Sequence, residues 1–133
     1  MPFVIDASVA ACWLLSDERH SVADAAFARI AREPALAPSL WWFEMRNLMI
    51  VNERRGRIDA AQTFRALKLL RDLPVMIDTA ANEETLLNFA RRRRLTAYDA
   101  AYLELAHRSQ CPLATLDAAL AAAARAEGVE LVG

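Results

Sequence analysis

The sequence predicts an α/β protein in which a central, mostly parallel five-stranded sheet lies between two layers of helices. Short apolar segments alternate along the chain with longer segments of helical periodicity, and strands joined by helical crossovers form parallel sheets covered on both faces. The hydrophobic share of 56 % exceeds the usual ~45–50 %, and much of the excess is alanine, which suits helices packed closely against a sheet. A chain of this length is typical of one domain, so residues 1–133 are expected to form a single unit.

The first half of the chain is expected to contain two strands and three helices. A short apolar run follows the first proline, and Pro38 ends a second one in ALAPSL. Ser8 and Ser39 are placed to cap the helices that follow these runs, and Gly56 is placed to end the third helix. The segment SDERH separates the first helix from the second. The expected bounds are strand 3–6, helix 9–15, helix 21–32, strand 35–37 and helix 40–55.

The second half is expected to contain four helices and three strands. Asp59 and Gln62 have the spacing of a capping box. The apolar runs PVMID, PLATLD and VELV indicate strands, while Thr96 begins one helix and Gly128 ends the last. The expected bounds are helix 60–72, strand 74–78, helix 82–93, helix 96–109, strand 112–117, helix 118–127 and strand 129–132.

The composition excludes several classes of site. Three glycines are too few for a phosphate-binding loop or a dinucleotide fingerprint. The two cysteines and two histidines lack any zinc-site spacing. A haloacid-dehalogenase-type phosphatase would need an aspartate where Ser8 stands, and a response-regulator receiver would need a late lysine, whereas Lys68 is the sole lysine. Asp6 interrupts any signal peptide and no run is long enough to span a membrane, so the protein is expected to be cytoplasmic and free of membrane contacts.

Four acidic residues stand where a site is expected. Asp6 and Asp117 each end an apolar strand, and parallel strands end at the same edge of a sheet, where open α/β folds bind ligands. Glu44 falls on the apolar stripe of its helix in SLWWFEMRN, and Asp99 falls in the first turn of its helix in LTAYDAAYLELA. Individually, Asp6, Asp99 and Asp117 are also suited to capping helices, and Glu44 to a buried ion pair with an arginine.

Taken together, the four carboxylates indicate a metal site. Clustered carboxylates raise one another's pKa values, and a divalent cation removes this penalty. Oxygen ligands alone favour Mg²⁺ or Mn²⁺ over zinc. The net charge of −1 argues against a nucleic-acid partner by itself, but without these four carboxylates it becomes +3, carried by fifteen arginines and one lysine.

The segments VIDASVAACWLL, APSLWWFEMRN, LTAYDAAYLELA and PLATLDAAL, which span nearly the whole chain, resemble a PIN domain, and more narrowly the VapC toxins of type II toxin–antitoxin modules. The resemblance implies a Mg²⁺-dependent endoribonuclease, with Mn²⁺ able to substitute. Its catalytic and metal-binding acids would be Asp6, Glu44, Asp99 and Asp117, with Ser8 and Thr115 in support. The implied partners are an RNA substrate, a VapB-type antitoxin and a second copy in a homodimer.

Two rival functions stay open at this point: a PIN-type RNA-processing nuclease without an antitoxin, and a catalytically silent PIN-like binding module. The basic run ARRRRLT contains Arg91, Arg92, Arg93 and Arg94, which either bind RNA phosphates or complement the end of a helix. Trp41 and Trp42 are adjacent on one helix and point in different directions, so core packing and an interface are both open for them.

Overall fold

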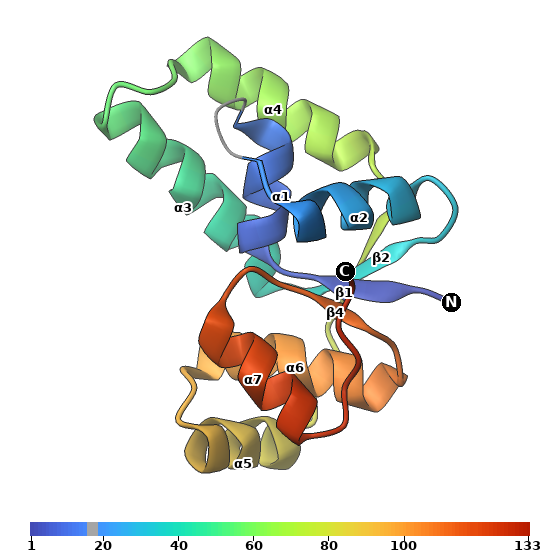
Figure 1. Ribbon diagram of the computed structural model, residues 1–133. Coiled ribbons are helices and arrows are strands. Elements are labelled where there is room, and N and C mark those ends of the chain that lie inside the picture. The colour runs from blue at the N-terminus through green and yellow to red at the C-terminus, as the bar shows by residue number, and fades with distance from the viewer. Residues whose placement is uncertain (16–18) are drawn as a thin grey trace.

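The computed structural model describes residues 1–15 and 19–133, and residues 16–18 of the SDERH segment lie outside the described residues. Four strands form one parallel sheet in the order β3-β2-β1-β4 (Figure 1). Val4 pairs with Leu36 on one side and with Leu113 on the other. The strands are β1 (Phe3–Ile5), β2 (Ala35–Pro38), β3 (Val75–Asp78) and β4 (Leu113–Ala114).

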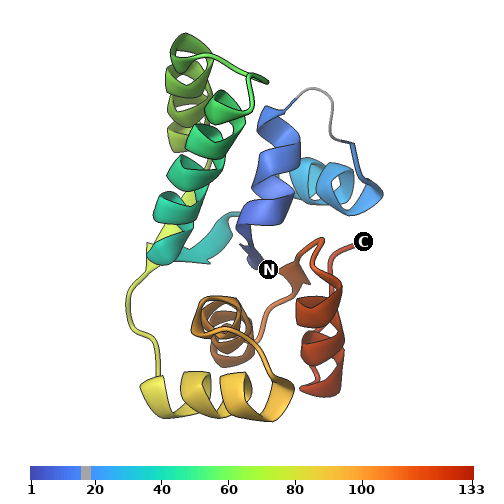
Figure 2. The same cartoon turned by 90° about the vertical axis from the view of Figure 1, so that its left-hand side faces the viewer.

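Seven helices cover the two faces of this sheet within the described residues. In Figures 1 and 2, α1 to α4 lie on one side and α5 to α7 on the other, so the predicted three-layer arrangement is confirmed. Their bounds are α1 (Ala7–Leu14), α2 (Ser21–Ile30), α3 (Leu40–Arg54), α4 (Ala60–Asp72), α5 (Glu83–Arg93), α6 (Ala97–Ser109) and α7 (Ala118–Ala126). No helix in this part of the chain is both long enough and apolar enough to cross a membrane.

The expected fifth strand is wrong. Leu131 makes only an isolated parallel bridge with Leu113, through hydrogen bonds from Leu113 N to the carbonyl of Glu130 (2.9 Å) and from Val132 N to the carbonyl of Leu113 (3.0 Å). β4 itself is only two residues long, because the chain leaves the sheet at Thr115, whose hydroxyl donates to Asp6. A longer ladder with the C-terminal segment therefore does not form.

Local signals place the helix ends. The capping box of Asp59 and Gln62 is present at the start of α4, as predicted. At α1 the predicted cap is wrong, because Asp6 rather than Ser8 accepts the hydrogen bond from Val9 N. α5 ends at Arg94 in the left-handed conformation (φ 54°), which uncouples α5 from α6 and lets α6 run separately across the sheet.

The core lies on both faces of the sheet. Every residue of α6 from Ala100 to Ala106 is buried, since this helix lies between the sheet and α5. On the opposite face, Trp41, Met45 and Met49 of α3 are fully buried. The helices return antiparallel to the strands, so the amino-terminal ends of α1, α3, α6 and α7 gather beside the carboxyl ends of the strands, on the left in Figure 1.

Candidate active site

The four predicted acidic residues lie at the amino-terminal ends of four helices. Asp6 and Asp117 are the N-cap residues of α1 and α7. Glu44 lies in the second turn of α3, and Asp99 lies in the first turn of α6. β1 and β4 are neighbours although they are far apart in sequence, so the site lies where the strand order reverses, the usual place for a ligand in an open α/β sheet.

Asp6 is the most deeply buried of these acids, at 5 % exposed. Its Oδ1 accepts hydrogen bonds from the Ser8 hydroxyl (2.6 Å) and from Val9 N (3.1 Å), and its Oδ2 accepts one from the Thr115 hydroxyl. A carboxylate has about four acceptor sites, so one site on Oδ2 is left for a ligand. Burial raises the pKa of Asp6, assisted by the charge of Asp99, although these hydrogen bonds oppose the shift.

Two hydroxyl groups link the segment after β4 to the turn that begins α1 through hydrogen bonds. Ser8 Oγ accepts a hydrogen bond from Leu116 N (3.0 Å) while donating to Asp6. Thr115 Oγ1 accepts one from Asp117 N (3.0 Å) while also donating to Asp6. Because each hydroxyl donates a hydrogen bond to the Asp6 carboxylate, the segment that carries Asp117 is held beside Asp6. Ser8 and Thr115 therefore both contact Asp6.

Glu44 is half-buried, and its partner is a phenol rather than an arginine. The hydroxyl of Tyr102 on α6 donates a hydrogen bond to Glu44 Oε1, which ties α3 to α6 beside the acids. Burial raises the pKa of Glu44, and the charges of Asp6 and Asp99 raise it further. Tyr102 was not predicted from the sequence; a tyrosine one turn after Asp99 on a buried helix was the available signal.

The four acids are close enough for electrostatic repulsion to act between them. Burial raises the pKa of Asp99, and the charge of Asp117 raises it further. Asp99 in turn raises the pKa values of Asp6 and Glu44. Over residues 1–15 and 19–133, no three acidic, histidine or cysteine side chains are arranged closely enough to hold a metal ion. The carboxylates are thus near enough to repel one another but do not converge on one point.

The basic run at the end of α5 is partly occupied by an ion pair. Arg92 and Arg93 both contact Glu127, at 2.9 and 2.7 Å. Glu127 follows the last turn of α7, at the opposite end of that helix from Asp117. Arg91 contacts Asn88 on its own helix, and Arg94 ends the helix. The observed contacts of Arg92 and Arg93 thus point away from the acids.

The tryptophans of α3 lie on its inner side. Trp41 is fully buried, and its Nε1 is the one buried side-chain nitrogen or oxygen without a hydrogen bond among the described residues. Trp42 is half-buried, packs edge-on against Trp41 and has the guanidinium groups of Arg46 and Arg71 over its ring. Core packing thus accounts for Trp41, and contact with α4 for Trp42.

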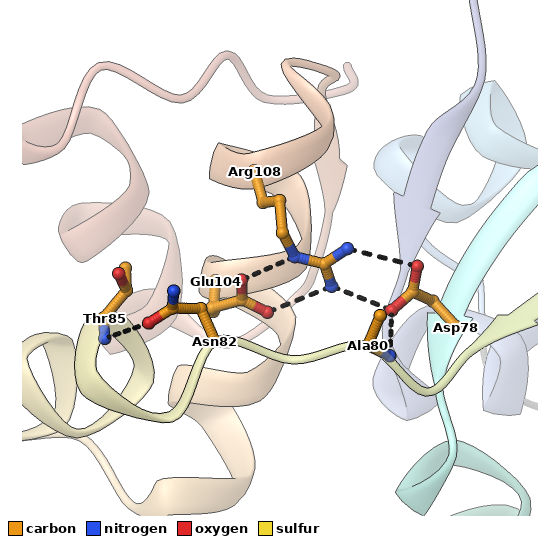
Figure 3. Close-up of polar contacts among 6 residues, drawn as sticks. All are labelled: Asp78, Ala80, Asn82, Thr85, Glu104 and Arg108. Atoms are coloured by element: carbon orange, nitrogen blue, oxygen red, sulfur yellow. Dashed lines mark hydrogen bonds and ion pairs between the residues drawn. The ribbon is translucent and has the colours of Figure 1, made fainter.

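A second polar cluster was not predicted from the sequence. Glu104 of α6 is 1 % exposed and accepts hydrogen bonds from Arg108 Nε (2.7 Å) and Nη2 (3.2 Å). The same guanidinium donates to both carboxylate oxygens of Asp78 at the end of β3, at 2.8 and 3.2 Å (Figure 3). Arg108 holds the pKa of Asp78 below its usual range. The available signal was the four-residue spacing of Glu104 and Arg108 on a largely apolar helix.

Comparison with known proteins identifies a family and two similar structures. The family model of the PIN domain matches residues 3–131. PAE2754 from Pyrobaculum aerophilum is similar in structure (TM-score 0.72, 27% sequence identity), with 92% of this chain and 84% of that chain covered. VapC20 of Mycobacterium tuberculosis, a sarcin-ricin loop cleaving toxin, shares the fold (TM-score 0.63, 14% identity), with 91% and 94% covered. No curated protein matches the sequence.

Proposed function

Because the chain belongs to the PIN-domain family, we propose that it is a divalent-metal-dependent endoribonuclease acting as the toxin of a toxin–antitoxin pair. The predicted resemblance to a PIN domain is confirmed for family and fold, and the narrower VapC type is part of the proposal. One observation above all supports the nuclease proposal: four carboxylates stand at four helix amino termini on one edge of the sheet, and repulsion among them helps to raise the pKa values of Asp6, Glu44 and Asp99.

The donor chemistry of this group fits a hard divalent cation. All four side chains offer oxygen, the ligand type that Mg²⁺ and Mn²⁺ prefer, and a cation would relieve their mutual repulsion. Asp6 and Asp99 would be the principal ligands, and Glu44 and Asp117 would complete the set. When bound, such an ion lowers the pKa of water and neutralises charge on phosphate oxygens.

The side chains supply positioning and proton transfer. Water, rather than the ribose 2′-hydroxyl, is the proposed nucleophile, so the products would carry a 5′-phosphate and a 3′-hydroxyl. Tyr102 occupies Oε1 of Glu44, which leaves Oε2 to accept a proton from that water. A carboxyl group whose pKa is raised is a better proton acceptor near neutral pH. Ser8 and Thr115 hold Asp6 and Asp117 in a fixed relation.

The proposal includes two protein partners, an antitoxin and a second copy of this chain. Large exposed apolar side chains are available for such protein contacts, since Leu69 of α4 is 64% exposed and Met76 of β3 is 57% exposed.

The test compares cleavage of a mixed RNA pool by wild type, Asp99→Asn and Asp24→Asn, each with Mg²⁺, Mn²⁺ or EDTA. Asp24 is an exposed residue of α2 outside the acidic group, so its amide variant is the matched control for loss of one carboxylate. We expect wild type and Asp24→Asn to leave 5′-phosphate ends, with cleavage lost in EDTA and lost in Asp99→Asn. Circular dichroism establishes that each variant is folded.

Other outcomes distinguish the rival functions. Equal cleavage by wild type and Asp99→Asn would contradict the proposed site. Absence of cleavage by the folded wild type with either metal would favour the silent binding module. A wild type that cleaves RNA could also be expressed without arresting growth and could bind no protein encoded by a neighbouring reading frame. That combination would favour an RNA-processing nuclease.

A further inference from the structure

Two exposed aromatic rings flank the acidic group. Phe43 directly precedes Glu44 on α3 and is 68% exposed; Tyr98 directly precedes Asp99 on α6 and is 66% exposed. The hydrogen bond from Tyr102 to Glu44 joins the two helices at this point. Tyr98 lies one turn before Tyr102 on the same face of α6. The two rings are therefore carried by the two helices that this hydrogen bond joins.

Packing does not explain either ring. Among the described residues, Tyr98 makes no hydrogen bond, ring contact or ion contact, whereas Tyr102 on the same helix is 1% exposed and hydrogen-bonded. The ring of Phe43 has one such contact, with the guanidinium of Arg46 at 5.2 Å from its centroid. The chain thus places its buried aromatics, such as Trp41, in the core, and leaves these two rings in solvent beside the acids.

The segment of α3 and α4 that carries Phe43 has a net positive charge. Residues 40–72 contain seven arginines and lysines against four acids, a net charge of +3, while the whole chain has −1. Within the described residues Arg46 forms no ion pair with a carboxylate, and it lies over both Phe43 and Trp42. An arginine held against an aromatic ring without an acidic partner is suited to contact phosphate while the ring contacts a base.

These observations favour nucleotides over a peptide as the ligand that contacts the two rings. Proteins bind unpaired bases on exposed aromatic side chains beside cationic groups that follow the backbone. Both rings adjoin residues of the proposed catalytic group, where a scissile phosphate would lie. A paired helix keeps its bases stacked on one another, so only an unpaired strand could use the rings.

We propose that Phe43 and Tyr98 are base-stacking residues that hold unpaired nucleotides of the RNA substrate beside the acidic group. This inference rests on the proposed function, because it assumes that RNA enters the acidic group. Arg46 assists by contacting a phosphate beside the base on Phe43.

The experiment measures RNA binding separately from cleavage. In an Asp99→Asn background with Mg²⁺, fluorescence anisotropy gives the Kd for a labelled single-stranded decamer and for the same sequence as a duplex. Phe43→Ala and Tyr98→Ala are each expected to weaken single-strand binding by roughly 5- to 150-fold, the range for loss of one base–aromatic stack. Tyr98→Phe should stay within about twofold of the reference, because stacking requires the ring and not the hydroxyl.

Two controls separate stacking from a general effect. Phe64→Ala removes an equally exposed ring from α4, away from the acids, and should leave the Kd unchanged. A decamer carrying 2-aminopurine should lose fluorescence on binding to the reference protein and keep it with Tyr98→Ala.

Several results would overturn the proposal. Unchanged single-strand affinity in both alanine variants would assign the rings to a protein contact. A loss in Tyr98→Phe as large as in Tyr98→Ala would mean that the hydroxyl, not the ring, binds. Equal losses for single strand and duplex would also refute stacking. If the reference protein bound no RNA, the nuclease proposal would fail as well, whereas metal-dependent cleavage by wild type alongside unchanged affinities would refute the stacking alone.

Discussion

Replacing Arg108 by methionine should destabilise the protein far more than an ordinary surface substitution. Among residues 1–15 and 19–133, the guanidinium is the one observed partner of the Glu104 carboxylate, which is 1 % exposed. Methionine keeps most of the aliphatic length of arginine but leaves Glu104 buried and uncompensated. The perturbation therefore tests whether the cluster of Asp78, Glu104 and Arg108 fixes α6 against the end of β3.

The expected loss follows from how each partner is buried. Removing one partner of a buried ion pair costs about 3–5 kcal/mol, mostly because the other charge is left without compensation. The side chains of Arg108 and Asp78 are 32% and 28% exposed, so this outer pair resembles a surface pair and contributes at most about 1 kcal/mol. Arg108→Met should thus lose about 3–5 kcal/mol of the ~5–15 kcal/mol that stabilises a typical domain.

Urea unfolding followed by circular dichroism at pH 7 measures this loss, provided that the m-value is unchanged. Asp78→Asn is the matched control and should cost about 1 kcal/mol or less. The double variant Glu104→Gln/Arg108→Met should recover most of the stability, because it removes the buried charge together with its partner. An Arg108→Met protein within about 1 kcal/mol of wild type, or a double variant no more stable than the single one, would refute the reasoning.

Three further predictions concern the acidic group. Asp99→Asn should raise the Tm by a few degrees in EDTA, because it removes the charge that repels Asp6 and Glu44. Mg²⁺ should raise the Tm of wild type more than that of the variant. Scanning calorimetry measures both changes. Carboxyl groups with raised pKa values stabilise the fold below their ordinary values of 3.8 and 4.5 and lose that contribution as pH rises through the folded-state values. Between about pH 4 and 7 in EDTA, urea titrations should therefore show wild type losing more stability than Asp99→Asn, and an equal loss would argue against the coupling. Thr115→Val should cost about 1–3 kcal/mol by removing a donor from buried Asp6 and an acceptor from Asp117 N, whereas Thr115→Ser should cost clearly less.

The acids could be located from the sequence because each stands at a position set by local rules. Asp6 ends an apolar run, and once the sheet is parallel the carboxyl ends of β1 and β4 must share an edge. The partner of Glu44 could not be located in this way, since it depends on how α3 and α6 cross, which no short-range pattern reports. The ion pairs of Arg92 and Arg93 with Glu127 likewise depend on where α7 packs against α5. The missing fifth strand depends on Thr115 leaving the sheet to reach Asp6.

Capping a helix and serving the proposed site are not alternatives for Asp6 and Asp117. Each carboxylate accepts a hydrogen bond through Oδ1 from a backbone amide of its own helix, Asp6 from Val9 N and Asp117 from Leu120 N, which leaves Oδ2 for other partners. A helix amino terminus favours a negative charge, and at Asp6 the hydrogen bond from Val9 N opposes the rise of the carboxyl pKa that burial causes. Alanine at either position would remove the cap, at about 1 kcal/mol, together with the charge. Asparagine keeps a capping oxygen and removes the charge, while its amide nitrogen replaces the other carboxylate oxygen. A loss of cleavage in an asparagine variant that is as stable as wild type therefore reports on the chemistry and not on the fold.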